Sequence, residues 1–143
     1  MWHNVFAMEI HTLDPQIRFM AHLHLDLETI EAGIPVATMT SFASASGIQL
    51  RDIYSVVIPA RTLKHRRSRK EPLTPDESDK LARLVRIYDL TVQVFGDREK
   101  AIRWLNHPKQ RYDARTPLQM LRTELGGRMV EEMLIQIDEG MFA

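Results

Sequence analysis

Apolar positions follow helical spacing through most of the chain. The longest periodic run lies within residues 75–95, where large apolar side chains recur mostly in steps of three and four: Leu81, Leu84, Val85, Tyr88, Val92 and Phe95. A second apolar face on this run, carried by Ile87, Leu90 and Val94, predicts a central helix that packs on two sides. No alternating apolar and polar run follows residue 25, so the pattern predicts an all-α fold.

Residues that start or stop helices mark the expected element boundaries. Thr74, Pro75 and Glu77 form the clearest start signal, because they supply an N-cap, a proline at the first helical position and the glutamate of a capping box. Gly126 and Gly127 are expected to break the chain between the last two helices. Together the signals predict helices over residues 27–32, 35–46, 49–57, 59–69, 75–95, 97–106, 117–125 and 127–139.

The helices at 49–57 and 59–69 are separated by a very short connection. This spacing predicts a tight helix-turn-helix in which the basic helix is the second. We therefore expect a helix-turn-helix DNA-binding domain at residues 26–72 and a helical C-terminal domain at residues 73–143. Residues 1–25 lack a sustained apolar period and form an unassigned N-terminal arm.

Composition narrows the class of protein further. The chain has 143 residues, of which 44% are hydrophobic and 27% charged, values that are ordinary for a globular protein. The absence of cysteine excludes disulfides, thiol nucleophiles and thiolate metal sites. No apolar run is long enough to span a bilayer, and the first residues lack the pattern of a secretory signal. We expect a cytoplasmic protein with no membrane partner.

Basic charge is concentrated in one window although the net charge is zero. Residues 49–70 contain seven Lys or Arg against one Asp, a net of +6, and most of these bases fall on the second helix of the predicted pair. Long cationic side chains on such a helix suit DNA phosphates and guanine edges. A solvated charged face, or a patch that meets an acidic protein, is the alternative. The predicted DNA-binding residues are Arg61, Thr62, Lys64, His65, Arg66, Arg67 and Arg69.

The sequence offers little support for metal binding or catalysis. His22 and His24 lie two residues apart near Asp26, which would suit a metal only if a further ligand were supplied. No nucleophile elbow, phosphate-binding glycine loop or metalloprotease motif is present. We expect no catalytic residue, no cofactor and no metal site.

Spaced motifs in the second half point to a known family. They comprise Phe95-Gly96, Ala101, Trp104-Leu105, Pro108, Thr116-Pro117, Leu121, Gly126, Val130, Leu134 and the ending from Gly140 to Ala143. In order and spacing they resemble the C-terminal toxin-binding domain of the Xre/MbcA/ParS antitoxins. Ile58-Pro59, Arg61-Thr62-Leu63 and Arg66, followed by Leu73-Thr74 and Glu77-Ser78, resemble the Xre-like helix-turn-helix half of the same family. The family usually has glycine where this chain has Ala114, so we expect either no left-handed residue there or a different turn.

The resemblance implies a function. Such antitoxins bind a RES-domain toxin, an enzyme that consumes NAD, and repress their own operon through the helix-turn-helix. The expected toxin-binding residues are Trp104, Met133, Ile137, Gly140, Met141, Phe142 and Ala143. We hypothesise that the last residues enter and occlude the toxin's NAD cleft.

Two further expectations concern assembly and an alternative role. Helix-turn-helix proteins read paired half-sites, so we expect a homodimer, formed through the two-faced helix 75–95 or its neighbours. The alternative function is a stand-alone transcriptional regulator whose C-terminal half dimerises or senses a ligand.

Overall fold

The fold of the described part of the chain is helical, as predicted. The computed structural model describes residues 26–141, and every regular element in that range is a helix, with one isolated bridge between Lys109 and Arg115. In chain order the elements are α3 (Leu27–Ala32), α4 (Ala37–Ser46), α5 (Leu50–Val57), α6 (Ala60–Ser68), α7 (Pro75–Phe95), α8 (Arg98–Leu105), the 3₁₀-helix η1 (Gln110–Tyr112), α9 (Pro117–Met120) and α10 (Glu124–Asp138).

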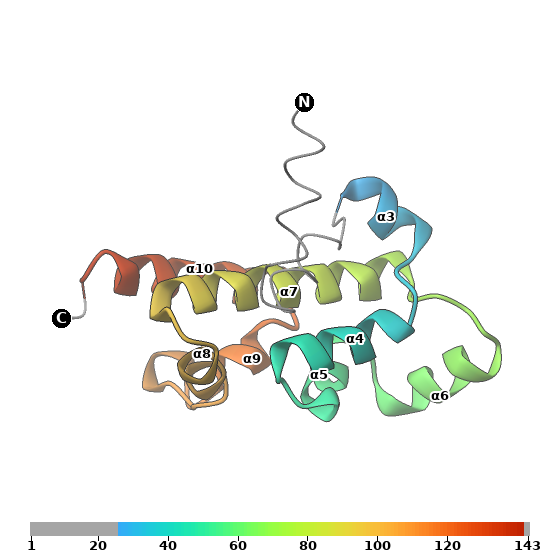
Figure 1. Cartoon of the computed structure of the whole chain (residues 1–143), viewed down its shortest axis with the longest axis horizontal. Coiled ribbons are helices and arrows are strands. Elements are labelled where there is room, and N and C mark those ends of the chain that lie inside the picture. The colour runs from blue at the N-terminus through green and yellow to red at the C-terminus, as the bar shows by residue number, and fades with distance from the viewer. Residues whose placement is uncertain (1–25, 142–143) are drawn as a thin grey trace.

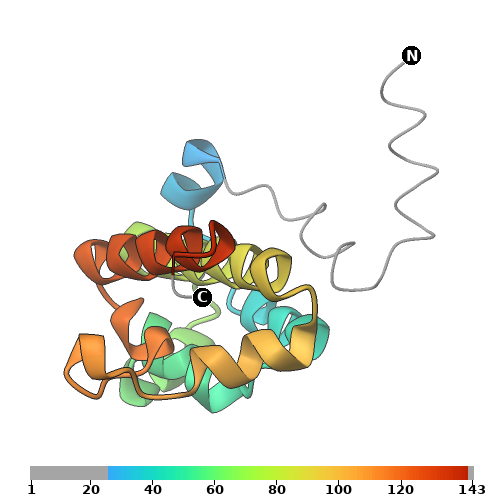
Figure 2. The ribbon, with the colours of Figure 1, turned by 90° about the vertical axis from the view of Figure 1, so that its left-hand side faces the viewer.

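The helices form two layers. The long helices α7 and α10 lie side by side in one layer, and α4, α5, α8 and α9 form the other (Figures 1 and 2). Arg83 of α7 pairs with Glu124 of α10, and Arg86 pairs with Glu131 further along, so the two long helices run in the same direction. Their carboxyl ends therefore lie at the same end of the molecule.

Helix α7 is the central helix that the sequence predicts. Thr74 and Glu77 form the expected capping box, and Gly96 ends the helix in a left-handed conformation with φ 70°. Tyr88 packs its ring edge-on against Phe42 of α4, with ring centroids 5.5 Å apart, and its hydroxyl donates to the carbonyl of Ser46. On the other side α7 packs against α10. One hydrophobic core thus runs through both halves, and the expected domain boundary at residue 72 stays a prediction.

The prediction that α7 offers spare apolar surface for a dimer needs correction. Leu84, Val85 and Ile87 are fully buried within a single copy of the chain. These three side chains are therefore not available to a second copy, whereas the apolar residues nearer the carboxyl end of α7 are only half-buried: Leu90, Val92, Val94 and Phe95. The homodimer remains an expectation, and the fully buried part of α7 does not support it.

The prediction that Gly126 and Gly127 break a helix is wrong. Both glycines lie in the first turn of α10, and the preceding helix α9 has already ended at Met120. Thr123 caps α10 by accepting a hydrogen bond from the amide of Gly126. A Cβ on Gly126 would lie 1.9 Å from the carbonyl oxygen of Met120, so glycine is needed for close packing between the two helices.

The structure also corrects two smaller expectations, about the start of α4 and the turn before Thr116. Helix α4 begins at Ala37 with Val36 as N-cap, so Pro35 precedes the helix instead of forming its first turn. Asp113 and Ala114 both adopt positive φ, 53° and 66°, so the turn before Thr116 does use left-handed residues although glycine is absent. The amide of Ala114 donates to the carbonyl of Lys109, and this backbone contact holds the unusual conformation.

Candidate functional sites at the two ends of the molecule

The predicted helix-turn-helix is formed by α5 and α6. Helix α5 buries Ile53, Val56 and Val57, and Ile58 and Pro59 connect it to α6. Leu63 is the only buried residue of α6 and anchors the helix to the body. Because a single apolar side chain is buried, most of α6 faces outward at one end of the molecule (Figure 1).

The structure divides the predicted DNA-binding residues into two groups. Five side chains are exposed along and just after α6: Arg61, Lys64, His65, Arg67 and Arg69. Thr62 is half-buried. Arg66 instead turns toward α7, where its guanidinium lies 3.1 Å from Glu77 and 3.5 Å from Glu71. The first group can reach a ligand, whereas Arg66 braces α6 against α7.

Tyr54 contacts one of the predicted DNA-binding residues, although it was not itself predicted to be functional. Its hydroxyl accepts a hydrogen bond from Arg67, whose guanidinium also lies 5.6 Å from the centre of the tyrosine ring. Tyr54 belongs to α5, so the contact crosses from the first helix of the pair to the second. It holds one of the exposed cations of α6 in a defined position. Tyr54 and Arg67 are 13 positions apart, and no periodic pattern in the sequence relates residues at that separation, so the contact could not be predicted.

At the opposite end, Trp104 of α8 lies in a shallow hollow. The ring packs against Phe95 at 5.7 Å, and the ammonium of Lys109 lies 4.9 Å above it. Lys100, Arg103 and His107 complete the rim of the hollow. Burial lowers the pKa of Lys109 from its ordinary value. An aromatic floor ringed by cations can receive an acidic or aromatic group of a partner.

The predicted toxin-binding residues on α10 lie at the same end as Trp104. Met133 is half-buried and receives a hydrogen bond from the hydroxyl of Tyr112 at 3.4 Å, and Ile137 is also half-buried. Gly140 adopts φ 76° directly after α10, and Met141 is 66% exposed. Phe142 and Ala143 lie outside the described residues.

Helix α10 also carries exposed apolar residues that were not among the predicted toxin-binding residues. Leu125 is 68% exposed, Ile135 46% and Met129 38%. Leu125 and Met129 are four positions apart and continue in steps of four to Met133 and Ile137, a spacing also found among core residues, so periodicity alone could not identify them as exposed. Ile135 lies on another side of the helix. The hydroxyl of Tyr112 reaches the carbonyl of Met129, and burial raises the pKa of this tyrosine to about 12.

A metal site and a membrane span are not found in the described part of the chain. Within residues 26–141 no cluster of three His, Asp or Glu side chains is placed to bind a metal ion. Asp26 instead caps α3 through the amide of Thr29, and the other two residues of the metal hypothesis, His22 and His24, lie outside the described residues. None of the helices in the same range is both long and apolar enough to cross a bilayer.

Comparison with known proteins matches both ends of the molecule. Residues 26–86 match the antitoxin Xre-like helix-turn-helix domain, and residues 91–140 match the antitoxin Xre/MbcA/ParS C-terminal toxin-binding domain. A protein of Yersinia enterocolitica named Antitoxin Xre is 33% identical over 119 residues, covering 82% of this chain and 80% of the relative. The chain belongs to the Xre antitoxin family. This confirms the resemblance in both halves.

Two other members of the Xre antitoxin family are also similar. A Photorhabdus laumondii protein is 33% identical over 114 residues, which cover 78% of this chain and 77% of the relative. A Pseudomonas putida protein is 54% identical over 84 residues, which cover 59% of this chain but 53% of the relative. The match thus spans about half the length of the Pseudomonas relative. Both proteins are named Antitoxin Xre.

Proposed function

We propose that this chain is an antitoxin that neutralises a cognate RES-domain toxin with its C-terminal end and represses its own operon through α6. The observation that carries the proposal is the match of the two halves to an antitoxin helix-turn-helix domain and a toxin-binding domain. Helix α6 and the carboxyl end of α10, which carry described candidate residues for the two tasks, lie at opposite ends of the long axis (Figure 1). Both tasks are binding, so the chain itself performs no chemistry.

The proposed DNA contact uses the outward side of α6. Arg61, Lys64 and His65 are three and four positions apart, so they project from one side of the helix and can enter the major groove together. A homodimer would present two such helices to the two halves of a palindromic site. Each phosphate neutralised contributes a slope of about −0.9 to the dependence of log affinity on log salt.

Replacing Arg61 and Lys64 with alanine tests this contact. Both side chains are exposed, so the double variant should keep its melting temperature while losing binding to the duplex upstream of its gene. A variant with Lys100 and Arg103 replaced by alanine is the matched control, because it removes two exposed cations from α8. Equal binding by the Arg61/Lys64 variant and the wild type would show that α6 is not the DNA reader.

The proposed inhibition occludes the toxin's NAD cleft without chemistry. Met141 is exposed beyond Gly140, and Trp104 lies near the same end of the domain. The domain could therefore rest on the rim of a cleft while residues 141–143 enter it. Burial of one large apolar side chain such as Phe142 would contribute about 2–3 kcal/mol, which is one to two decades of affinity.

Deletion of residues 140–143 tests occlusion. The truncated chain should stay folded and bind DNA, because α10 ends at Asp138 and α6 lies at the other end. NAD consumption by the enzyme encoded beside this gene should then resume in its presence. Full inhibition by the truncated chain would rule out occlusion by the tail. The lack of any adjacent toxin gene would favour a stand-alone regulator instead.

A further inference from the structure

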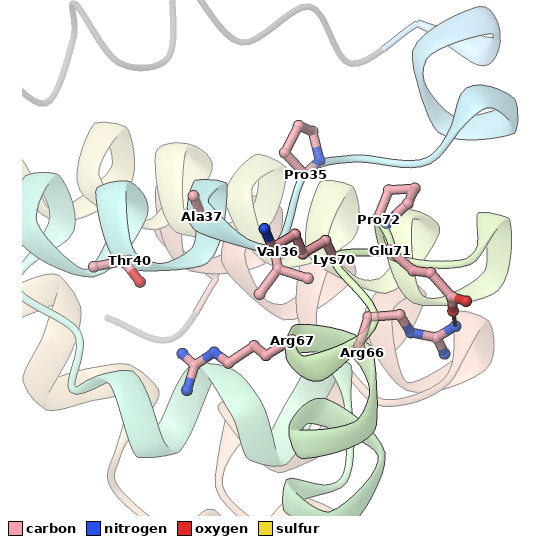
Figure 3. A pocket seen from close by; sticks show the side chains of 9 residues that line it. All are labelled: Pro35, Val36, Ala37, Thr40, Arg66, Arg67, Lys70, Glu71 and Pro72. Carbon is pink, nitrogen blue, oxygen red and sulfur yellow. Dashed lines mark ion pairs between the residues drawn. The ribbon is translucent and has the colours of Figure 1, made fainter.

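A cleft lies between the start of α4 and the end of α6. It has a volume of about 510 Å³, and its walls include Val36, Ala37 and Thr40 on one side and Arg67, Lys70 and Glu71 on the other. Figure 3 shows the ammonium of Lys70 directed toward the start of α4, while Arg66 points away toward Glu71. Of the predicted DNA-binding residues, Arg66 and Arg67 line this cleft, whereas Arg61, Lys64 and His65 on the outward side of α6 do not.

Positive charge remains in the cleft after the ion pairs are counted. Glu71 is paired with Arg66, which also pairs with Glu77. Within residues 26–141 neither Arg67 nor Lys70 forms an ion pair with a carboxylate. Arg67 is held from the side by Tyr54, a neutral partner, and keeps its charge available. The cleft therefore presents two cations to a ligand.

Lys70 holds its position at a conformational cost. Its φ is 54°, in the left-handed region that glycine occupies most easily. Glycine would end α6 with less strain, but it would carry no ammonium into the cleft. Lys70 follows the C-cap residue Arg69, a position where left-handed residues commonly end helices, and its amide donates to the carbonyl of Arg67.

The wall formed by α4 adds hydrogen-bond donors, which favour an anionic ligand as the two cations do. Helix α4 begins at Ala37, and neither a side-chain cap nor an acidic residue in its first turn offsets the positive end of its dipole. Val36 and Ala37 line the cleft, so this end of the helix borders it. The hydroxyl of Thr40, one turn further along, is exposed beside it. Cations combined with helix amides and a hydroxyl are the chemistry that binds phosphate groups.

We propose that this cleft binds a phosphate group between Lys70, Arg67 and the first turn of α4. The expected source is a DNA backbone phosphate beside the bases that α6 contacts, and this part rests on the proposed function of α6. The front of α6 then reads bases while its last turn and Lys70 hold the backbone. Free phosphate, alone or on a nucleotide, offers the same chemistry from a second source.

Three variants of the full chain separate the effect of the Lys70 charge on DNA binding from an effect on folding. Lys70→Gln removes the ammonium and keeps the strained backbone, whereas Lys70→Gly removes the ammonium and relieves the strain. Lys100→Gln removes an exposed lysine from α8 at the other end and is the control. Each variant is titrated with a duplex of the upstream region between 50 and 200 mM NaCl.

Both Lys70 variants should lower the salt slope by about 0.9 per bound subunit, whereas the control keeps the wild-type slope. Over this fourfold range of salt, the wild type then loses about 3.5-fold more affinity per subunit than either variant. Lys70→Gly should also melt at a higher temperature than the wild type. Its lower salt slope would then not be caused by misfolding.

Inorganic phosphate added to the isotopically labelled full chain identifies the source. We expect amide NMR shifts at Ala37 and Lys70 in the wild type that are absent in Lys70→Gln. Such shifts with an unchanged salt slope would support the cleft as a site for free phosphate. Unchanged slopes and no shifts would overturn the proposal. If the wild type binds no duplex, the proposed role of α6 fails, and the phosphate titration alone decides the cleft.

Discussion

Replacing Gly126 with alanine distinguishes two explanations for the paired glycines. If Gly126 merely interrupted a helix, alanine would stabilise the protein by about 1 kcal/mol, because alanine is the better helix former. The structure places Gly126 inside α10, with the carbonyl oxygen of Met120 only 1.9 Å from the position of the new Cβ. The packing explanation therefore predicts the opposite sign.

The expected magnitude follows from the size of the clash. Relief of a 1.9 Å contact with backbone requires α9 and α10 to separate by about 1 Å, an overpacking that costs about 3 kcal/mol. Subtracting the gain in helix propensity leaves a net loss of about 2 kcal/mol. For a chain of this size, such a loss lowers the melting temperature by about 4–8 °C.

Urea and thermal unfolding of the full chain measure this loss. Gly96→Ala is the matched control, because a Cβ there meets nothing within 4 Å and only the φ of 70° is unfavourable. We expect about 1 kcal/mol of destabilisation for the control, less than for Gly126→Ala. An unchanged or higher melting temperature for Gly126→Ala would refute the packing explanation.

Three further predictions concern the C-terminal half. Ala114→Gly should stabilise the fold by about 0.5–1 kcal/mol in urea unfolding, because it relieves a φ of 66°; a lower midpoint would contradict this. Arg83→Met should destabilise by about 2–3 kcal/mol, because it leaves the carbonyl of Leu121 without its buried donor; an unchanged midpoint would show that water replaces it. Burial raises the pKa of Tyr112 to about 12, so its stabilising contribution is complete below pH 10 and is lost as pH rises through 12; Tyr112→Phe should lose less stability over that range.

Local sequence signals predicted the helices well because their causes are local. Thr74 and Glu77 form a capping box within one turn, and Gly96 ends α7 through its own left-handed backbone. The apolar steps along α7 identified its buried faces correctly as far as Tyr88, and the apolar residues beyond Tyr88 are half-buried. Such features depend on residues a few positions apart, so they can be read before the fold is known.

Features that depend on distant contacts could not be read in this way. Gly126 looks like a helix breaker until Met120 is placed against it. Arg66 belongs to a basic run, but its direction is set by Glu77 on another helix. The cleft at Lys70 joins residues about thirty positions apart, and no periodic pattern reports such proximity.

Simultaneous binding of toxin and DNA tests the two-ended arrangement most directly. A labelled duplex of the upstream region is titrated with the antitoxin alone and with its purified complex with the toxin, and anisotropy is recorded. Because α6 and the end of α10 lie at opposite ends of the molecule, the complex should bind the duplex at least as tightly as the antitoxin alone (Figure 1). Release of DNA as toxin is added would contradict separate surfaces for the two partners.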